Sequence, residues 1–215
     1  MSRLAASLPI YSGSSTFIRW GRTSCPASSD LLYKGSMAGP DLRSSGGGSN
    51  YLCLPDDPSY DPQAPKGAVY SFLSSAQYEV RKSSYIFGKR ISTVEHYVPC
   101  VTCEIQQRAS KIMIPAATLC PSDDWVLEYK GYLMTSATHV GSNDDSVIIK
   151  GKHSRDSYVC VDGKAEAIPS PAVGDWIQGV TLYAVSASCT GPGALKSSHP
   201  YRGATAALSC VVCSK

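Results

Sequence analysis

Two Cys-x-x-Cys pairs have the spacing most suggestive of chemistry in this chain: Cys100 with Cys103, and Cys210 with Cys213. Two such pairs can supply the four thiolates of a structural zinc site, and one pair at a helix start can act in thiol–disulfide exchange. Both pairs lie in strand-like sequence, where residues three apart point to opposite faces of a sheet. We therefore expect each cysteine to reach a different distant partner in a disulfide. Zinc and redox chemistry are the weaker interpretations.

The cysteine count predicts an oxidising, extracellular location, because reducing compartments keep thiols free. Eight of the nine cysteines fall into two sets of four, and we expect each set to close two bridges of its own. This disulfide framework comprises Cys25, Cys53, Cys100, Cys103, Cys120, Cys160, Cys210 and Cys213. Cys189 is left over, and such a cysteine is either buried and inert or a thiol for an intermolecular bond. Both interpretations stay open.

The other reactive side chains do not form a recognisable constellation. The four histidines lack metal-binding spacing, and the chain has neither a Gly-x-Ser-x-Gly elbow nor a dinucleotide fingerprint. Aspartates cluster at 56–61, 123–124 and 144–145, and such loops can hold calcium, but EF-hand spacing is absent and solvated turns are the favoured interpretation. We expect no catalytic residue, no bound metal and no cofactor, and we do not expect an enzyme.

One short element, Arg19-Trp20-Gly21-Arg22, combines guanidinium groups with an indole ring. Such groups offer hydrogen bonds and a stacking plane, so Arg19, Trp20 and Arg22 form a candidate binding surface. The matching stretch of the second half, Ile112-Met113-Ile114-Pro115, is apolar and looks like a core strand. A buried strand is therefore the favoured interpretation of the first element as well.

The same motifs recur in the same order in both halves of the chain, which indicates an internal duplication. The motifs are Cys-Pro, Tyr-Lys-Gly, Tyr-x-Cys and Cys-x-x-Cys, and they begin at Cys25, Tyr33, Tyr51 and Cys100, then at Cys120, Tyr129, Tyr158 and Cys210. We expect an N-terminal extension over 1–16, a first cysteine-framed repeat over 17–108 and a second over 109–215.

Short runs rich in β-branched and aromatic residues, bounded by Gly, Pro, Ser and Asp, predict strands, and helical periodicity is hard to find. The expected fold is mostly β: two diverged, disulfide-stapled antiparallel β repeats packed as a pseudo-twofold unit with long loops. The polar boundary at 106–111 is too short for a flexible linker, so the halves should pack together.

Charge and hydropathy exclude two classes of partner. The net charge of +3 is spread over 20 basic and 17 acidic residues without a block of like sign, so we expect no nucleic acid. No run approaches the roughly 20 apolar residues of a membrane-spanning helix, so we expect no membrane partner.

In combination, several segments resemble the C-terminal non-collagenous domain of the short-chain collagens of sponges and other invertebrates. The matching segments are Ile18–Pro26, Leu32–Gly35, Ser45–Pro55, Val98–Cys103, Gly131–Met134 and Tyr158–Asp162. The resemblance implies an extracellular, non-enzymatic matrix module that trimerises or otherwise assembles. The chain contains no Gly-X-Y repeat, which collagen triple helices require. The family pattern also has a second cysteine shortly after the position of Cys189, and its absence here favours an intermolecular bond.

We therefore expect a secreted, non-catalytic structural or assembly protein of extracellular matrix or mineralised skeleton. Its partners would be further copies of itself and matrix proteins. The alternative is a carbohydrate-binding protein, a lectin with one glycan site per repeat. That hypothesis is motivated by thirteen tyrosines and three tryptophans on a rigid, repeated scaffold.

Overall fold

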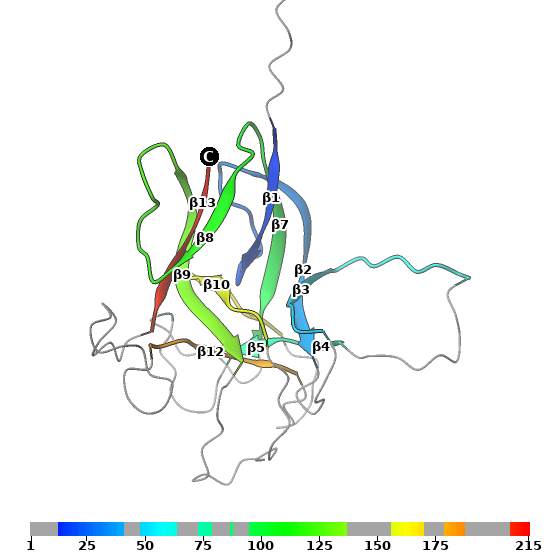
Figure 1. The fold of residues 1–215 in the computed structure, drawn as a ribbon. Helices are drawn as coiled ribbons and strands as arrows, with labels where there is room; N and C mark the ends of the chain where they lie inside the picture. The colour runs from blue at the N-terminus through cyan, green and yellow to red at the C-terminus, as the bar shows by residue number, and fades with distance from the viewer. Residues whose placement is uncertain are drawn as a thin grey trace, which may run out of the picture.

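A computed structural model describes residues 13–40, 48–63, 73–78, 87, 95–136, 156–169, 179–187 and 207–215. All the regular structure in these residues is β, and the strands form one curled, mixed sheet (Figure 1). The long strands stand upright in that view, and β4, β5 and β12 cross below them. The described residues include no helix long and apolar enough to cross a membrane. The prediction of a mostly β, disulfide-stapled fold is confirmed.

The described strands divide between the two cysteine-framed segments. The first segment and the residues just before it contribute β1 (Ser15–Trp20), β2 (Asp30–Pro40), β3 (Leu52–Pro55), β4 (Leu73–Ser75), β5 (Gln77–Tyr78), β6 (Glu95–Tyr97) and β7 (Pro99–Ile105). The second contributes β8 (Lys111–Pro115), β9 (Val126–Ser136), β10 (Val159–Asp162), β11 (Ile168–Pro169), β12 (Thr181–Ala184) and β13 (Ser209–Ser214). The first segment was expected to begin at Phe17, but β1 begins two residues earlier.

Each segment forms an antiparallel set of four strands with the same order. The first set runs β1-β7-β2-β3, and the second runs β8-β13-β9-β10. The long strands β2 and β9 each pair with three other strands in succession, β9 with β13, β10 and β12. The order of motifs in the sequence is thus accompanied by the same order of strands in both segments.

Within each segment the described strands pair antiparallel, as predicted, whereas two of the three described strand pairs that join the segments are parallel and the third, β6 with β11, is antiparallel. Strand β1 pairs with β10 at Trp20 and Val161, and β5 pairs with β12. No hairpin connects these strands, which are far apart in the chain, so no turn forces them to run in opposite directions. A pseudo-twofold would require β8 to pair with β3 as β1 pairs with β10, and among the described strands these two do not pair. The predicted twofold is not confirmed.

The four disulfides lie within the segments. Their pairs are Cys25–Cys103, Cys53–Cys100, Cys120–Cys213 and Cys160–Cys210. The two cysteines of each Cys-x-x-Cys motif reach different partners, as strand geometry requires for residues on opposite faces. The zinc and redox interpretations are therefore wrong, because all four thiols are oxidised. Cys189 lies outside the described residues.

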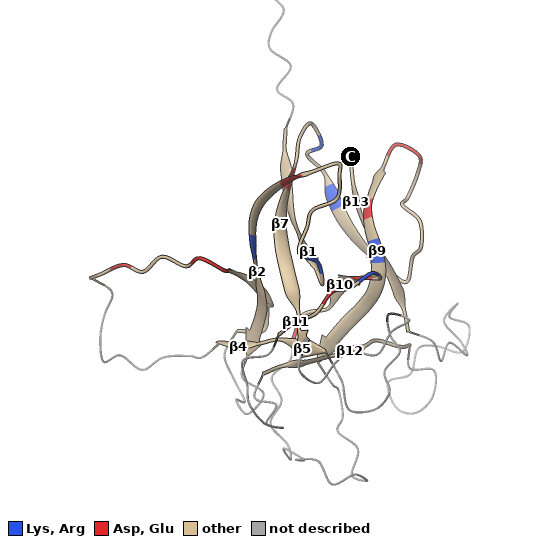
Figure 2. Cartoon of the chain, turned by 180° about the vertical axis from the view of Figure 1, so that it is seen from behind, with Lys and Arg blue, Asp and Glu red and all other residues tan. Residues whose placement is uncertain are grey.

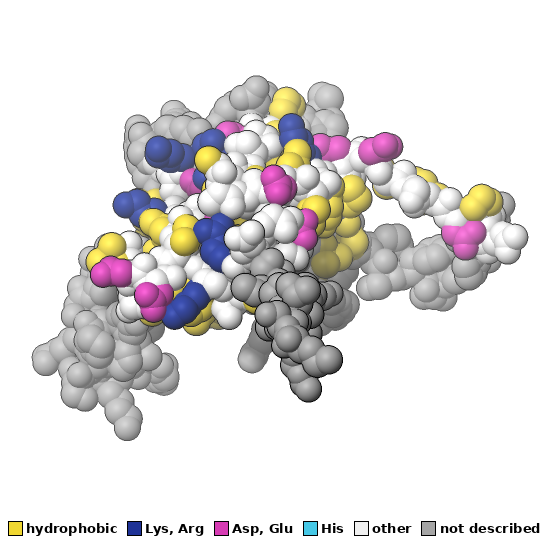
Figure 3. Space-filling model, turned by 90° about the horizontal axis from the view of Figure 1, so that it is seen from above, with side chains coloured by type: hydrophobic (Ala, Val, Ile, Leu, Met, Phe, Trp, Pro, Cys, Tyr) yellow, Lys and Arg dark blue, Asp and Glu magenta, His cyan; other side chains and the backbone are white. Residues whose placement is uncertain are grey.

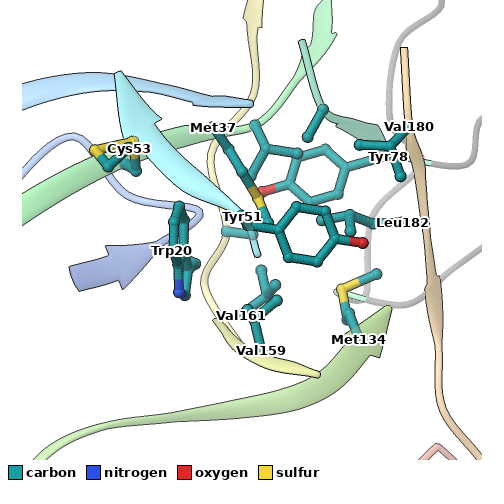
Figure 4. Packing of buried hydrophobic residues seen from close by; sticks show 14 residues of the cluster. Trp20, Met37, Tyr51, Cys53, Tyr78, Met134, Val159, Val161, Val180 and Leu182 are labelled. Carbon is teal, nitrogen blue, oxygen red and sulfur yellow. A yellow bond between two sulfur atoms is a disulfide. The ribbon is translucent and has the colours of Figure 1, made fainter. Parts of the chain in front are cut away.

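Two buried clusters hold the sheet together, and each contains residues of both segments. The first packs Trp20 and Met37 against Met134, Val161 and Leu182 (Figure 4). The second cluster comprises Phe17, Val101, Cys103, Ile105, Tyr129, Cys160, Cys210 and Val212. Because both cores are shared, neither segment buries its apolar residues alone.

Candidate docking edges

The candidate binding surface, Arg19-Trp20-Gly21-Arg22, lies where the two cysteine-framed segments join. Along β1, Phe17 points into the second buried cluster and Trp20 into the first, where its indole lies beside Tyr51 and Val161 (Figure 4). Trp20 also sits opposite Val161 in the parallel pair of β1 with β10. The indole is buried and cannot serve as an exposed stacking plane. The core interpretation of Trp20 therefore fits the structure better than the binding surface.

Arg19 makes a buried ion pair across this join. Its guanidinium lies 2.6 Å from a carboxylate oxygen of Asp162, and its Nε donates to the same oxygen at 2.8 Å. One Nη donates to the carbonyl of Ser24, and the guanidinium carbon lies 5.8 Å from the centre of the Tyr129 ring. The charge is thus compensated on several sides, as a buried charge requires.

Arg22 extends the join on its more exposed side. Its guanidinium lies 3.2 Å from Glu166 and donates to the carbonyl of Lys164 at 2.8 Å. The backbone N–H and the hydroxyl of Thr23 both donate to Glu166. Partial burial alone would raise the pKa of Glu166, but the Thr23 hydrogen bonds and the Arg22 charge lower it below its ordinary value.

Tyr129 is the centre of the apolar side of the join. Its ring stacks against Phe17 with centroids 6.2 Å apart, and its hydroxyl donates to the carbonyl of Cys160 at 3.0 Å. Burial, and then the nearby Asp162 charge, raise the pKa of the Tyr129 hydroxyl well above its ordinary value. We call this contact of β1 (Phe17, Arg19, Trp20) with Tyr129, Val161 and Asp162 the internal seam.

Four described strands have a neighbour on one side only, β3, β4, β8 and β11, and two of these, β3 and β8, are the outer strands of the two four-strand sets, away from the internal seam. In the described part of the chain β3 pairs with β2 alone, and β8 pairs with β13 alone. The ammonium group of Lys111, at the start of β8, donates to the carbonyl of Thr16. Apart from this contact, no described strand pairs with the other edge of β8 or with the outer edge of β3.

The residues on these edges are the sequence counterparts of residues buried in the internal seam. Counting from the shared motifs makes Ile112 the counterpart of Phe17, Tyr33 of Tyr129, and Leu54 of Val161. Ile112, Tyr33 and Leu54 are 43%, 38% and 39% exposed, whereas their counterparts are 5%, 5% and 0% exposed. The same structural positions are therefore covered at one end of the sheet and open at the other.

The local geometry of the two tyrosines is also the same. The hydroxyl of Tyr33 donates to the carbonyl of Cys53 at 3.3 Å, just as Tyr129 donates to its counterpart Cys160. In β2 the register shifts between Leu31 and Tyr33, and a shift occurs at the matching place beside β9. Tyr33 is therefore held as Tyr129 is, but no counterpart of Phe17 covers it.

The apolar strand Ile112–Pro115 was expected in the core, and that expectation is wrong for most of it. Ile112, Met113 and Pro115 are exposed, and Ile114 is half-buried. The sequence does contain a signal of an edge strand: Lys111 begins the strand and Pro115 ends it, and both residue types are typical of edge strands.

The charged side chains do not single out another surface. Lys, Arg, Asp and Glu are scattered over the strands, and acidic residues also follow β3 at 56–61 (Figure 2). From above, exposed hydrophobic atoms lie between charges of both signs (Figure 3). Among the described residues no group of His, Cys, Asp or Glu is arranged to hold a metal ion.

No protein-family model matches this chain. The resemblance to the non-collagenous domain of short-chain collagens therefore stays a prediction.

Proposed function

We propose that this chain is a secreted, non-catalytic structural protein that assembles with copies of itself, and with other matrix proteins, in an extracellular matrix or mineralised skeleton. The observation that carries the proposal is the pair of unpaired edges, which present Ile112 on one side and Tyr33 and Leu54 on the other. An unpaired strand with apolar side chains favours association with another chain, because water then leaves both surfaces.

The covalent framework supports the same proposal. Four disulfides in a sheet of this size fit an extracellular location, where thiols stay oxidised. Two of the cross-links join strands, β3 with β7 and β10 with β13, and so limit how far the sheet can open.

The carbohydrate-binding alternative stays a prediction, and no observation favours it. Trp20, the ring expected to offer a stacking plane, is buried in the first cluster. Exposed apolar side chains lie instead on the sheet edges, at Ile112, Tyr33 and Leu54.

The proposal is tested by measuring the mass of the native protein in solution over a wide concentration range, using light scattering after size exclusion. We expect the average mass to rise with concentration in the absence of reductant. Free thiols are blocked with iodoacetamide so that no new disulfide forms, and denaturing electrophoresis without reductant then separates non-covalent association, which is lost, from a disulfide through Cys189, which persists. A protein that stays monomeric at every concentration, with thiols blocked or not, would overturn the proposal.

A further inference from the structure

We infer that copies of this chain associate head to tail, with the β8 edge of one molecule docked on the β2–β3 edge of the next in the geometry of the internal seam. The inference rests on the proposed function and specifies the contact by which association occurs. The internal seam joins two different surfaces, β1 on one side and β9 with β10 on the other. Each molecule carries a second copy of both surfaces, β8 and the β2–β3 edge, and no described strand covers either of them.

The first unused surface is β8, the counterpart of β1. In the internal seam β1 presents Phe17 to the ring of Tyr129. On β8 the same position is Ile112, which is apolar and exposed. Both strands end alike, since Gly21 and Ala116 follow them with positive φ and their N–H groups donate to the carbonyls of Pro99 and Ser209.

The second unused surface is the β2–β3 edge, the counterpart of β9 with β10. It presents Tyr33 and Leu54 where the internal seam has Tyr129 and Val161. A second copy docked in the same way would place Ile112 over the ring of Tyr33 and Pro115 beside Leu54, as Phe17 lies over Tyr129 and Trp20 beside Val161. Four exposed apolar side chains would then be covered together.

The polar part of the internal seam has no counterpart on the open edges. Ile114 stands in place of Arg19, and Pro55 in place of Asp162. Pro115 stands in place of Trp20 and has no N–H, so it cannot donate a backbone hydrogen bond at that position. The contact between molecules is therefore held by apolar burial without the buried ion pair, which makes it weaker than the internal seam and reversible.

A contact between two different surfaces has a consequence for the assembly. It leaves one free edge of each kind at the ends, so it generates a ring if the rotation closes and a filament if it does not. A symmetric dimer would instead place β8 against β8 and leave Tyr33 and Leu54 uncovered. The internal seam provides no example of such a contact, so we assign the heterologous one.

The test uses one charged substitution on each edge, Ile112→Glu and Leu54→Glu, with Leu73→Glu as the matched control. Leu73 is an exposed leucine on β4, outside both edges. Far-ultraviolet circular dichroism and the thermal midpoint verify that each variant is folded. Light scattering then gives the mass of each variant alone and of the two edge variants mixed in equal amounts.

We expect each edge variant alone to stay monomeric at concentrations where the wild type and Leu73→Glu associate. Mixed together, the two should form dimers and nothing larger, because the pair retains one intact β8 edge and one intact β2–β3 edge. If the wild type associates but the edge variants associate like it, or the mixture forms no dimer, this inference is overturned and the proposed function stands. If the wild type is monomeric at every concentration, both this inference and the proposed function are overturned.

A second pair of variants tests the register. Ile114→Arg and Pro55→Asp together install the ion pair of the internal seam in the contact between molecules. We expect the double variant to associate more tightly than wild type by a factor of up to about five, the upper end of the gain from one surface ion pair. High salt should remove the gain. A double variant that associates no more tightly than wild type would show that the contact between molecules does not have the register of the internal seam.

Discussion

The guanidinium of Arg19 lies 2.6 Å from the carboxylate of Asp162, although 143 residues separate the two in the chain. Arg19 belongs to β1 of the first segment and Asp162 to β10 of the second, so this ion pair connects the two cysteine-framed halves. Asp162 also accepts the backbone N–H of Lys164 at 2.8 Å. The carboxylate is therefore held by its own turn as well as by the arginine.

Arg19→Met should destabilise the fold by about 3–5 kcal/mol, because it leaves the buried carboxylate of Asp162 without its cation. The double variant Arg19→Met with Asp162→Asn should lose less, since no charge is then left unpaired. Urea denaturation at neutral pH measures both. A single variant that loses no more stability than the double variant would contradict the assignment of a buried, compensated charge.

Glu166 should make the fold sensitive to acid. Its pKa is lowered below the ordinary 4.5 in the folded state, so at pH values between the two the unfolded chain binds more protons. The stabilisation is present above the unfolded pKa and is lost as the pH falls through the folded one. We expect the thermal midpoint of Glu166→Gln to fall less than that of wild type on acidification below about pH 4.5. Asp124→Asn, which alters an exposed ion pair with Lys215, should follow the wild-type curve.

Two glycines at matching positions test the difference between an inner and an edge strand. A Cβ atom on Gly131 would lie 1.8 Å from the carbonyl oxygen of Val161, and one on Gly35 would lie 1.9 Å from that of Leu54. Strand β10 has neighbours on both sides, whereas β3 can shift outward. We expect Gly35→Ala to cost about 1–3 kcal/mol and Gly131→Ala to cost more, as measured by urea denaturation. Equal losses would contradict the assignment of β3 as an edge.

Removing one disulfide should show how much of the stability is covalent. The double variant Cys53→Ala with Cys100→Ala opens a loop closed across 47 residues, which should cost about 4 kcal/mol in the chain-entropy account. Thermal unfolding in the absence of reductant measures the loss. A midpoint unchanged from wild type would show that the bridge does not constrain the unfolded chain.

The pairing itself is tested by peptide mapping without reduction. Because the two cysteines of each Cys-x-x-Cys motif stay on one peptide, we expect two groups of three linked peptides, each held by two bridges and confined to one of the two cysteine-framed segments. A peptide from 17–108 joined to one from 109–215 through any of these eight cysteines would contradict the structure. The same map shows whether Cys189 is free or linked to another molecule.

Much of the fold could be predicted because it depends on local pattern. Alternating β-branched residues bounded by turn residues indicated strands, and the repeated order of motifs assigned two bridges to each segment. Strand geometry showed that Cys100 and Cys103 face opposite ways. The location of Trp20 stayed open, because an alternating strand shows which residues share a face but not whether another strand covers that face.

The sequence by itself determined the class of fold, the cysteine framework and the existence of two related segments, since these follow from composition, period and motif order. Only the tertiary structure decided which copy of each surface is covered. Phe17 and Ile112 are equivalent in the repeat, yet one is buried and the other exposed. The difference arises because two segments joined head to tail bury one pair of unlike surfaces and leave the other pair free, and that choice depends on contacts between residues far apart in the chain.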